Sequence, residues 1–159
     1  VRDQVATQRT AAQKAAVAAQ KARLEKLQKD AEATRDRIVE KLKDLVEKLK
    51  AGVEESVPKP TLNKIPATAS PRQRAFLEKQ NARLMSDYNS KMSKARDKAN
   101  RAASDAQTAA REEIKAVGTS LREAVNKART EYNSARKATA EKYKSDLKTE
   151  LKNIEDKVR

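Results

Sequence analysis

Apolar residues recur every three or four positions along two long stretches of the chain, and the alternation typical of strands appears nowhere. In residues 1–53 these positions form one apolar row of Val1, Val5, Ala12, Ala15, Ala19, Leu27, Ala31, Ile38, Leu42, Leu45 and Leu49. In residues 71–159 the row consists of Leu77, Leu84, Tyr88, Met92, Ala95, Ala99, Ala103, Ala106, Ala110, Ile114, Val117, Leu121, Val125, Ala128, Tyr132, Ala135, Tyr143, Leu147, Leu151, Ile154 and Val158. Both rows advance by about 3.7 residues per step, nearer to an eleven-residue than to a seven-residue repeat. The pattern therefore predicts two long amphipathic helices, each with a narrow apolar stripe.

Prolines mark the boundaries of these helices. Pro58, Pro60 and Pro66 fall within residues 54–70, and residues 1–53 and 72–159 contain none. Ser70-Pro71-Arg72-Gln73 matches a helix start, with serine at the N-cap, proline at the first helical position and glutamine closing a capping box. We expect a helix over residues 1–53, a proline-containing connector over 54–70 and a second helix over 71–159.

Each of the two glycines allows two interpretations. Gly52 ends the first helix in a left-handed cap, or the helix continues to Ser56 and stops before Pro58. Gly118 precedes Ser120-Leu121-Arg122-Glu123, which matches a capping box and would break the second helix into a three-helix bundle. The apolar row passes Gly118 without a phase slip, which favours one continuous helix with a tolerated interior glycine.

The expected fold is all-α, an elongated antiparallel helical hairpin or coiled coil with near eleven-residue periodicity. If residue 53 lies opposite residue 72, the numbers of paired residues sum to about 125. This register places the alanine-rich segment around Ala15 and Ala19 beside Ala106 and Ala110, so that small residues meet small residues. The match between the two alanine clusters supports the hairpin.

In that register the apolar stripe beyond about residue 124 has no partner within the chain. It needs burial by residues before Val1, by a fold-back at Gly118 or by another chain. We expect a second chain to contact it, and self-association is one way to supply that chain. The residues expected to bind the partner through this stripe are Tyr132, Tyr143, Leu147, Leu151, Ile154 and Val158.

Composition excludes much chemistry. The chain has no Cys and no His, and only two Gly. Thiolate nucleophiles, imidazole triads, Cys or His metal sites and glycine-rich phosphate loops therefore cannot be built. Leu, Ile, Val and Phe make up about 16% of the residues, which leaves little material for a pocket of low dielectric. We expect a non-enzymatic structural or scaffolding protein without catalytic residues, cofactor or metal.

The excess of basic residues indicates which kind of partner the chain binds. The formal net charge is +14, above the magnitude of about 2–8 that keeps a small domain soluble. Basic residues form rows at helical spacing, and residues 72–101 hold nine basic and three acidic residues. The rows expected to bind an acidic partner surface within a larger assembly are Lys91, Lys94, Lys98 and Arg101, and Lys115, Arg122, Arg129 and Arg136.

The sequence leaves two alternative kinds of partner, nucleic acid and an anionic membrane surface. Nucleic acid would be bound without sequence specificity, because no DNA-reading motif is present and the aromatic residues lie on the apolar row or, for Phe76, beside it. An anionic membrane surface is the third candidate, since in period alone the chain resembles exchangeable apolipoproteins. The stripe is rich in alanine and lacks Trp, so insertion into a lipid interface would be weak.

Overall fold

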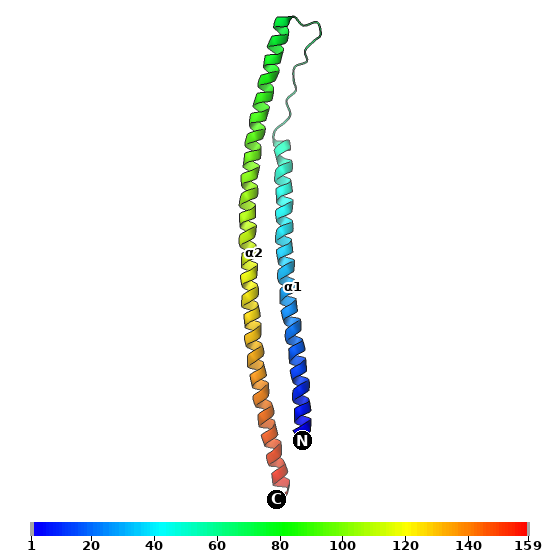
Figure 1. Ribbon diagram of the computed structural model, residues 1–159, viewed down its shortest axis with the longest axis vertical. Helices are drawn as coiled ribbons and strands as arrows, with labels where there is room; N and C mark the ends of the chain where they lie inside the picture. Colours follow the sequence, from blue (N-terminus) through cyan, green and yellow to red (C-terminus); the bar gives the residue numbers. More distant parts are fainter. Residues whose placement is uncertain (1, 159) are drawn as a thin grey trace. The chain divides into compact units, whose positions relative to one another are not determined.

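The protein is an antiparallel helical hairpin in a computed structural model that describes residues 2–158 (Figure 1). Helix α1 runs from Arg2 to Ser56 and helix α2 from Pro71 to Val158, joined by residues 57–70. No strand occurs within residues 2–158, so the predicted all-α class is confirmed. Val1, which was expected to start the first apolar row, lies outside the described residues.

The helix boundaries follow from local hydrogen bonding. The backbone N–H of Gln73 donates to the Ser70 hydroxyl over 3.2 Å, and the N–H of Ser70 donates to the Gln73 side chain over 3.1 Å. This is the capping box that the sequence predicts. At the other boundary α1 continues to Ser56, three residues beyond the expected end, and Gly52 lies inside the helix without a positive φ. The helix stops before Pro58, whose ring disfavours helical backbone in the residue that precedes it.

Gly118 does not interrupt α2. It has helical backbone and no positive φ, and half-buried Ile114, Val117 and Leu121 continue the row past it. A Cβ added at Gly118 would meet nothing within 4 Å. The three-helix alternative is therefore wrong, because the helical phase of the apolar row outweighs the capping-box pattern at Ser120.

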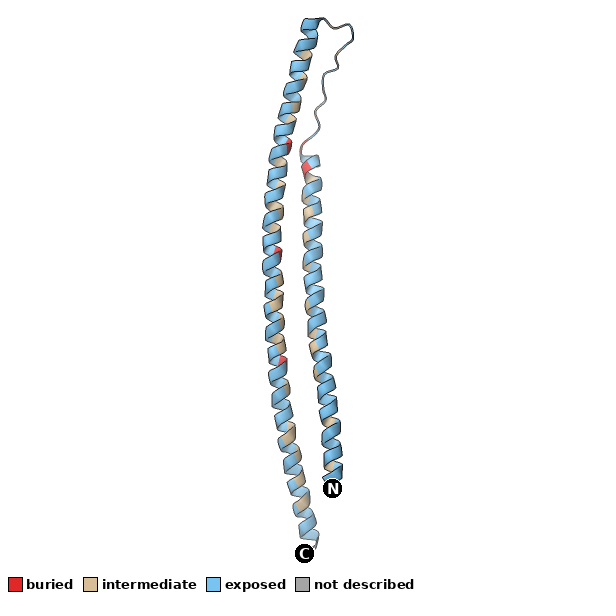
Figure 2. Cartoon of the chain, viewed as in Figure 1, coloured by how far each residue is buried: buried red, intermediate tan, exposed pale blue. Residues whose placement is uncertain are grey.

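Packing divides the chain into two units, which are described separately. The first unit comprises Val1–Asp36 and Ile114–Arg159, and the second comprises Arg37–Glu113. In each unit a segment of α1 packs against a segment of α2. The buried residues lie on the sides of the two helices that face each other (Figure 2).

In the second unit the connector runs back along α2. Val53 and Val57 pack with Met92 in a small core that Tyr88, Ala95 and Ala99 border. Further along, the Asn63 N–H donates to the Asn81 side chain over 2.7 Å, and the Asn81 amide donates to the Asn63 carbonyl over 3.0 Å. Met92 lies 21 residues into α2, or about 32 Å along the helix. An extended connector at about 3.1 Å per residue is long enough to cover that distance.

This path of the connector changes the register. In the first unit the Tyr143 hydroxyl donates to the Gln8 carbonyl over 3.5 Å, and Arg23 pairs with Glu131 over 2.7 Å. The numbers of these paired residues sum to 151 and 154, so the expected sum of about 125 is wrong. The expectation assumed that the connector closes the ends of the helices face to face, whereas it lies along α2 and displaces α1 toward the C-terminus of α2.

The altered register moves the alanine contacts. Ala15 and Ala19 are exposed instead of packed against Ala106 and Ala110. Ala128 is the most enclosed alanine, with 0% of its surface exposed, and it lies in the part of α2 that packs against α1 in the first unit. Ala106 and Ala110 are half-buried and buried, respectively, as expected of contact residues, but Ala15 and Ala19 are not their partners.

In this register α1 also packs against most of the apolar stripe beyond residue 124. Tyr132, Tyr143, Leu147 and Leu151 are half-buried in the first unit. Ala135 is exposed, and the end of the stripe is open, with Ile154 at 41% and Val158 at 82% exposure. The expectation that residues beyond 124 find no partner within the chain is therefore wrong, because α1 packs against this segment.

Candidate partner-binding site

The basic row of the first unit lies at the edge of the contact between the helices. Lys115, Arg122 and Arg129 each directly follow a residue of α2 that is buried or half-buried. One residue corresponds to a rotation of about 100° around a helix, which turns these side chains from the contact into solvent. All three are exposed, as is Arg136. The row thus borders the apolar contact and faces outward.

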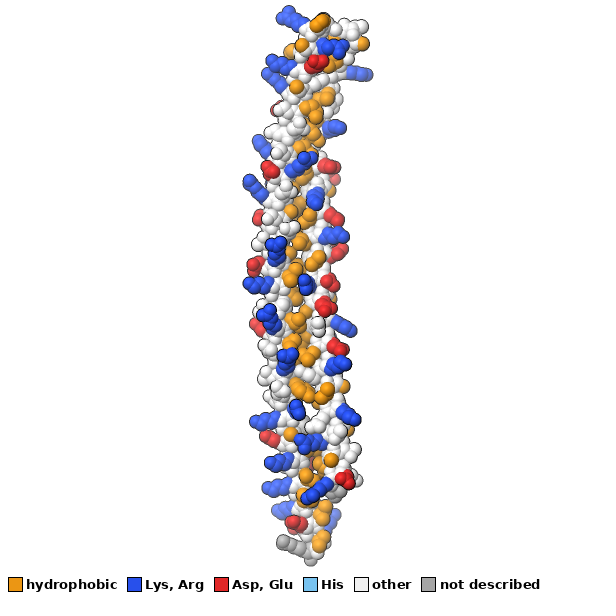
Figure 3. Space-filling view, viewed as in Figure 1, with side chains coloured by type: hydrophobic (Ala, Val, Ile, Leu, Met, Phe, Trp, Pro, Cys, Tyr) orange, Lys and Arg blue, Asp and Glu red, His pale blue; other side chains and the backbone are white. Residues whose placement is uncertain are grey.

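The basic row of the second unit has a related position. Lys91, Lys94, Lys98 and Arg101 each directly precede a buried or half-buried residue of α2, and all four are exposed. Figure 3 shows apolar side chains along the line between the helices and Lys and Arg side chains on either side of it. In each unit the cations that the sequence singles out therefore flank the apolar contact.

Few basic side chains of residues 2–158 are neutralised by contact with a carboxylate. Arg23 and Glu131 form the one ion pair found among residues 2–158, with side chains 46% and 48% exposed. The hydrogen bond from Arg23, aided by its positive charge, holds the pKa of Glu131 below its ordinary value. The other basic side chains of residues 2–158 have no carboxylate oxygen of a residue in this range within ion-pairing distance, so their positive field reaches solvent.

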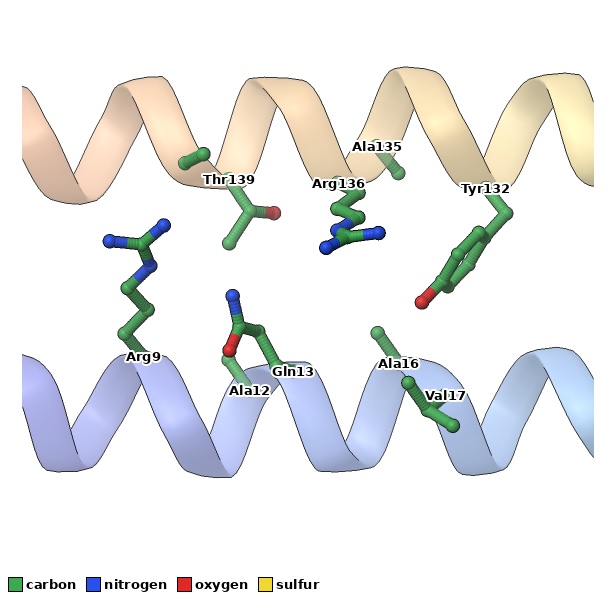
Figure 4. Close-up of a pocket in the computed structure, with 10 residues that line it drawn as sticks. Arg9, Ala12, Gln13, Ala16, Val17, Tyr132, Ala135, Arg136 and Thr139 are labelled. Atoms are coloured by element: carbon green, nitrogen blue, oxygen red, sulfur yellow. The ribbon is translucent and has the colours of Figure 1, made fainter.

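Two adjoining hollows lie between α1 and α2 in the first unit. The first has a volume of about 270 Å³ and an alanine floor formed by Ala12, Ala16 and Ala135, with Tyr132 at one end (Figure 4). Arg9 and Arg136 border it on the two helices. The hollow exists because alanine side chains leave the space between the two helices unfilled.

The second hollow continues the first toward the ends of the chain. It measures about 680 Å³, shares Arg9, Gln13 and Ala140 with the first, and is lined on its apolar side by Val5 and Leu147. Its cations are Arg2, Arg9, Lys137 and Lys144, and Glu141 is the acidic residue that lines it. We call the two hollows together the basic groove.

The sequence pattern identified only part of this groove. Arg136, Tyr132, Tyr143 and Leu147 were among the expected partner-binding residues, but Arg2, Arg9 and Lys137 were not. One signal was present, since residues 4–24 contain four basic residues and no Asp or Glu. This excess of basic residues indicates a binding site only in the observed register, which places this segment of α1 beside residues 132–147.

Residues 2–158 hold no group of three or more acidic, His or Cys side chains arranged to bind a metal ion. No helix within this range has both the length and the hydropathy of a membrane span. The basic rows and the basic groove are therefore the features of the described chain from which a function can be argued.

Comparison of the chain with protein-family models, with curated proteins and with solved structures gave no match.

Proposed function

We propose that this protein is a non-enzymatic helical scaffold that docks on an acidic protein surface through the basic faces of its hairpin. The observation that carries the proposal is the position of the eight cations of the basic rows, which are exposed, flank the helix contact in both units and form no ion pair with a residue of the range 2–158. Such a field attracts an acidic surface and speeds the association with it.

An acidic protein fits the surface better than a nucleic acid does. Tyr88, Tyr132 and Tyr143 are half-buried, so none of them is a fully exposed platform on which successive bases could stack. Phe76 is 61% exposed, and a single ring makes no stacking platform. Arg9 and Arg136 also border an open hollow with an alanine floor, and an apolar centre with a polar rim is the usual arrangement of a protein interface.

The proposal is tested by passing a native extract over the immobilised chain and identifying the molecules that stay bound. An acidic protein should stay bound through nuclease and detergent treatment and should leave at high salt, since salt screens the exposed charges. If nuclease treatment releases the bound material, the chain is instead a nucleic-acid binder. If detergent releases it, the chain is a lipid-surface protein.

A charge-reversed pair provides the matched control. Lys115→Glu with Arg122→Glu should weaken binding of the purified acidic partner about tenfold. Lys14→Glu with Lys29→Glu changes the net charge equally but alters exposed positions two residues from the contact row of α1, and it should have a much smaller effect. Equal losses from both pairs would show that only the net charge matters and would contradict docking through defined faces.

A further inference from the structure

The basic groove of the first unit combines an apolar floor with a rim on which cations far outnumber acidic residues, whereas the hollow at Val53 and Met92 has two cations, Lys50 and Arg96, against Glu54. The hollow between Leu27 and Leu121 is lined by apolar residues with Asp30 and no cation. The hollow along Tyr88 and Met92 carries both Arg96 and Asp97. The basic groove has five cations at its rim, namely Arg2, Arg9, Arg136, Lys137 and Lys144, against Glu141.

The floor is suited to large apolar side chains. The first hollow, at about 270 Å³, is larger than the cavity of about 150 Å³ that accepts benzene in an engineered protein. Val17, which lines it, is 55% exposed and would be covered by an occupant. A side chain placed between Ala16 and Ala135 would contact Tyr132 as well.

The shape of the groove indicates a helical occupant. Its walls are residues 2–17 of α1 and 132–147 of α2, which run side by side for about 24 Å. A third helix laid between two antiparallel helices inserts side chains at every third or fourth position. The floor is apolar near Ala16 and again near Val5, eleven residues away, so the anchors of the occupant should be spaced over eleven residues.

We infer that the basic groove binds an acidic amphipathic helix of a partner protein, with the apolar side chains of that helix in the two hollows and its carboxylates on the cationic rim. The inference rests on the proposed function and assigns the docking site and the chemistry of the partner. A second copy of this chain fits poorly, because each copy carries a net charge of +14. A phosphate backbone would meet the rim but would leave the apolar floor empty, and a flat membrane surface does not reach a floor that lies between two helices.

The test uses the full chain and three labelled probes at 0.15 M salt, about physiological ionic strength. The first probe is a helical 21-residue peptide with Leu at positions i, i+4, i+7 and i+11 and Glu at the flanking positions. The second replaces each Leu by Gln at equal charge, and the third is a 20-base-pair DNA duplex. Fluorescence anisotropy should give an affinity for the Leu peptide at least about tenfold higher than for the Gln peptide, because only the Leu side chains fill the hollows.

Two variants locate the binding. Ala135→Phe fills the first hollow from within and should lower the affinity for the Leu peptide about tenfold while leaving the Gln peptide unchanged. Ala138→Phe places the same ring on an exposed position of α2 outside both hollows and should leave the affinities for both peptides as in the unchanged protein.

The outcomes separate the two proposals. If the unchanged protein binds both acidic peptides equally, or if both Phe variants lose equal affinity, the groove assignment is overturned and docking on acidic surfaces stands. If neither peptide binds and the duplex does, the proposed function itself fails. The comparison of the two peptides on the unchanged protein decides the inference even if Ala135→Phe perturbs folding.

Discussion

Replacing Ala128 by Leu should destabilise the protein through overpacking. Ala128 has 0% of its surface exposed and lies where α2 packs against α1 in the first unit, so additional carbon atoms have no free space to occupy. Enlarging a side chain in a packed interior costs typically about 1–3 kcal/mol. For a chain of this length each kcal/mol lowers the midpoint of thermal unfolding by about 2–4 °C.

The assay is thermal unfolding followed by circular dichroism at 222 nm, and Ala138→Leu is the control. Ala138 lies on the same helix ten residues away and is exposed. Leu and Ala are both strong helix formers, so this change should shift the midpoint by no more than about 1 °C. Equal shifts at the two positions would refute the contact between α1 and α2 that encloses Ala128.

Three further changes test local features. Ser70→Ala removes the capping hydroxyl that accepts the N–H of Gln73 and should lower the free energy of unfolding by about 1 kcal/mol in urea titrations; no change would mean that the cap does not form in solution. Gly118→Ala should raise the unfolding midpoint, because alanine is better in a helix by about 1 kcal/mol and its Cβ meets nothing within 4 Å; a lower midpoint would contradict a helical Gly118. Arg23→Gln should raise the lowered pKa of Glu131 toward its ordinary value, which a carboxyl NMR titration measures, and an unchanged pKa would show that the ion pair is absent. Because the folded-state pKa is lowered, the stabilisation from this pair is present above the ordinary carboxyl pKa of 4.5 and is lost as the pH falls through the folded value.

Local features of the fold were predictable from the sequence because local chemistry decides them. The capping box at Ser70 needs only a serine, a proline and a glutamine at fixed spacing, and it forms as predicted. Continuity through Gly118 follows from the phase of its neighbours. Most positions of the rows are at least half-buried, and Val46 and Met85 take the places expected for Leu45 and Leu84, but Ala15, Ala135 and Ile154 are exposed. The narrow stripe gives each helix only a weak preference for one rotation.

The register was not predictable, because a contact between distant residues decides it. Asn63 and Asn81 exchange two hydrogen bonds that hold the connector along α2. Nothing in the spacing of Pro58, Pro60 and Pro66 distinguishes an extended strap from a closed turn. The matching alanine clusters favoured the wrong pairing, since alanine-rich segments fit one another in many registers.

The candidate site likewise has one part that the local sequence predicts and one part that depends on the register. The exposed cations of α2 follow from helical spacing, and all eight that were singled out are exposed. The basic groove depends on the register, because Arg9 and Arg136 line the same hollow only when residues 2–17 pack beside residues 132–147. Its cations on α1 were therefore invisible until the two helices were paired.

The register of the first unit is the feature on which the basic groove depends, and cross-linking measures it directly. The chain contains no Cys, so engineered pairs are the only thiols. Ala16→Cys with Ala135→Cys places two thiols in the same hollow, whereas Ala11→Cys with Ala116→Cys pairs exposed residues close to the register sum of about 125. With a short bis-maleimide at low protein concentration, the first pair should cross-link within the chain and the second should not. Cross-linking of the second pair in place of the first would contradict the register and, with it, the groove.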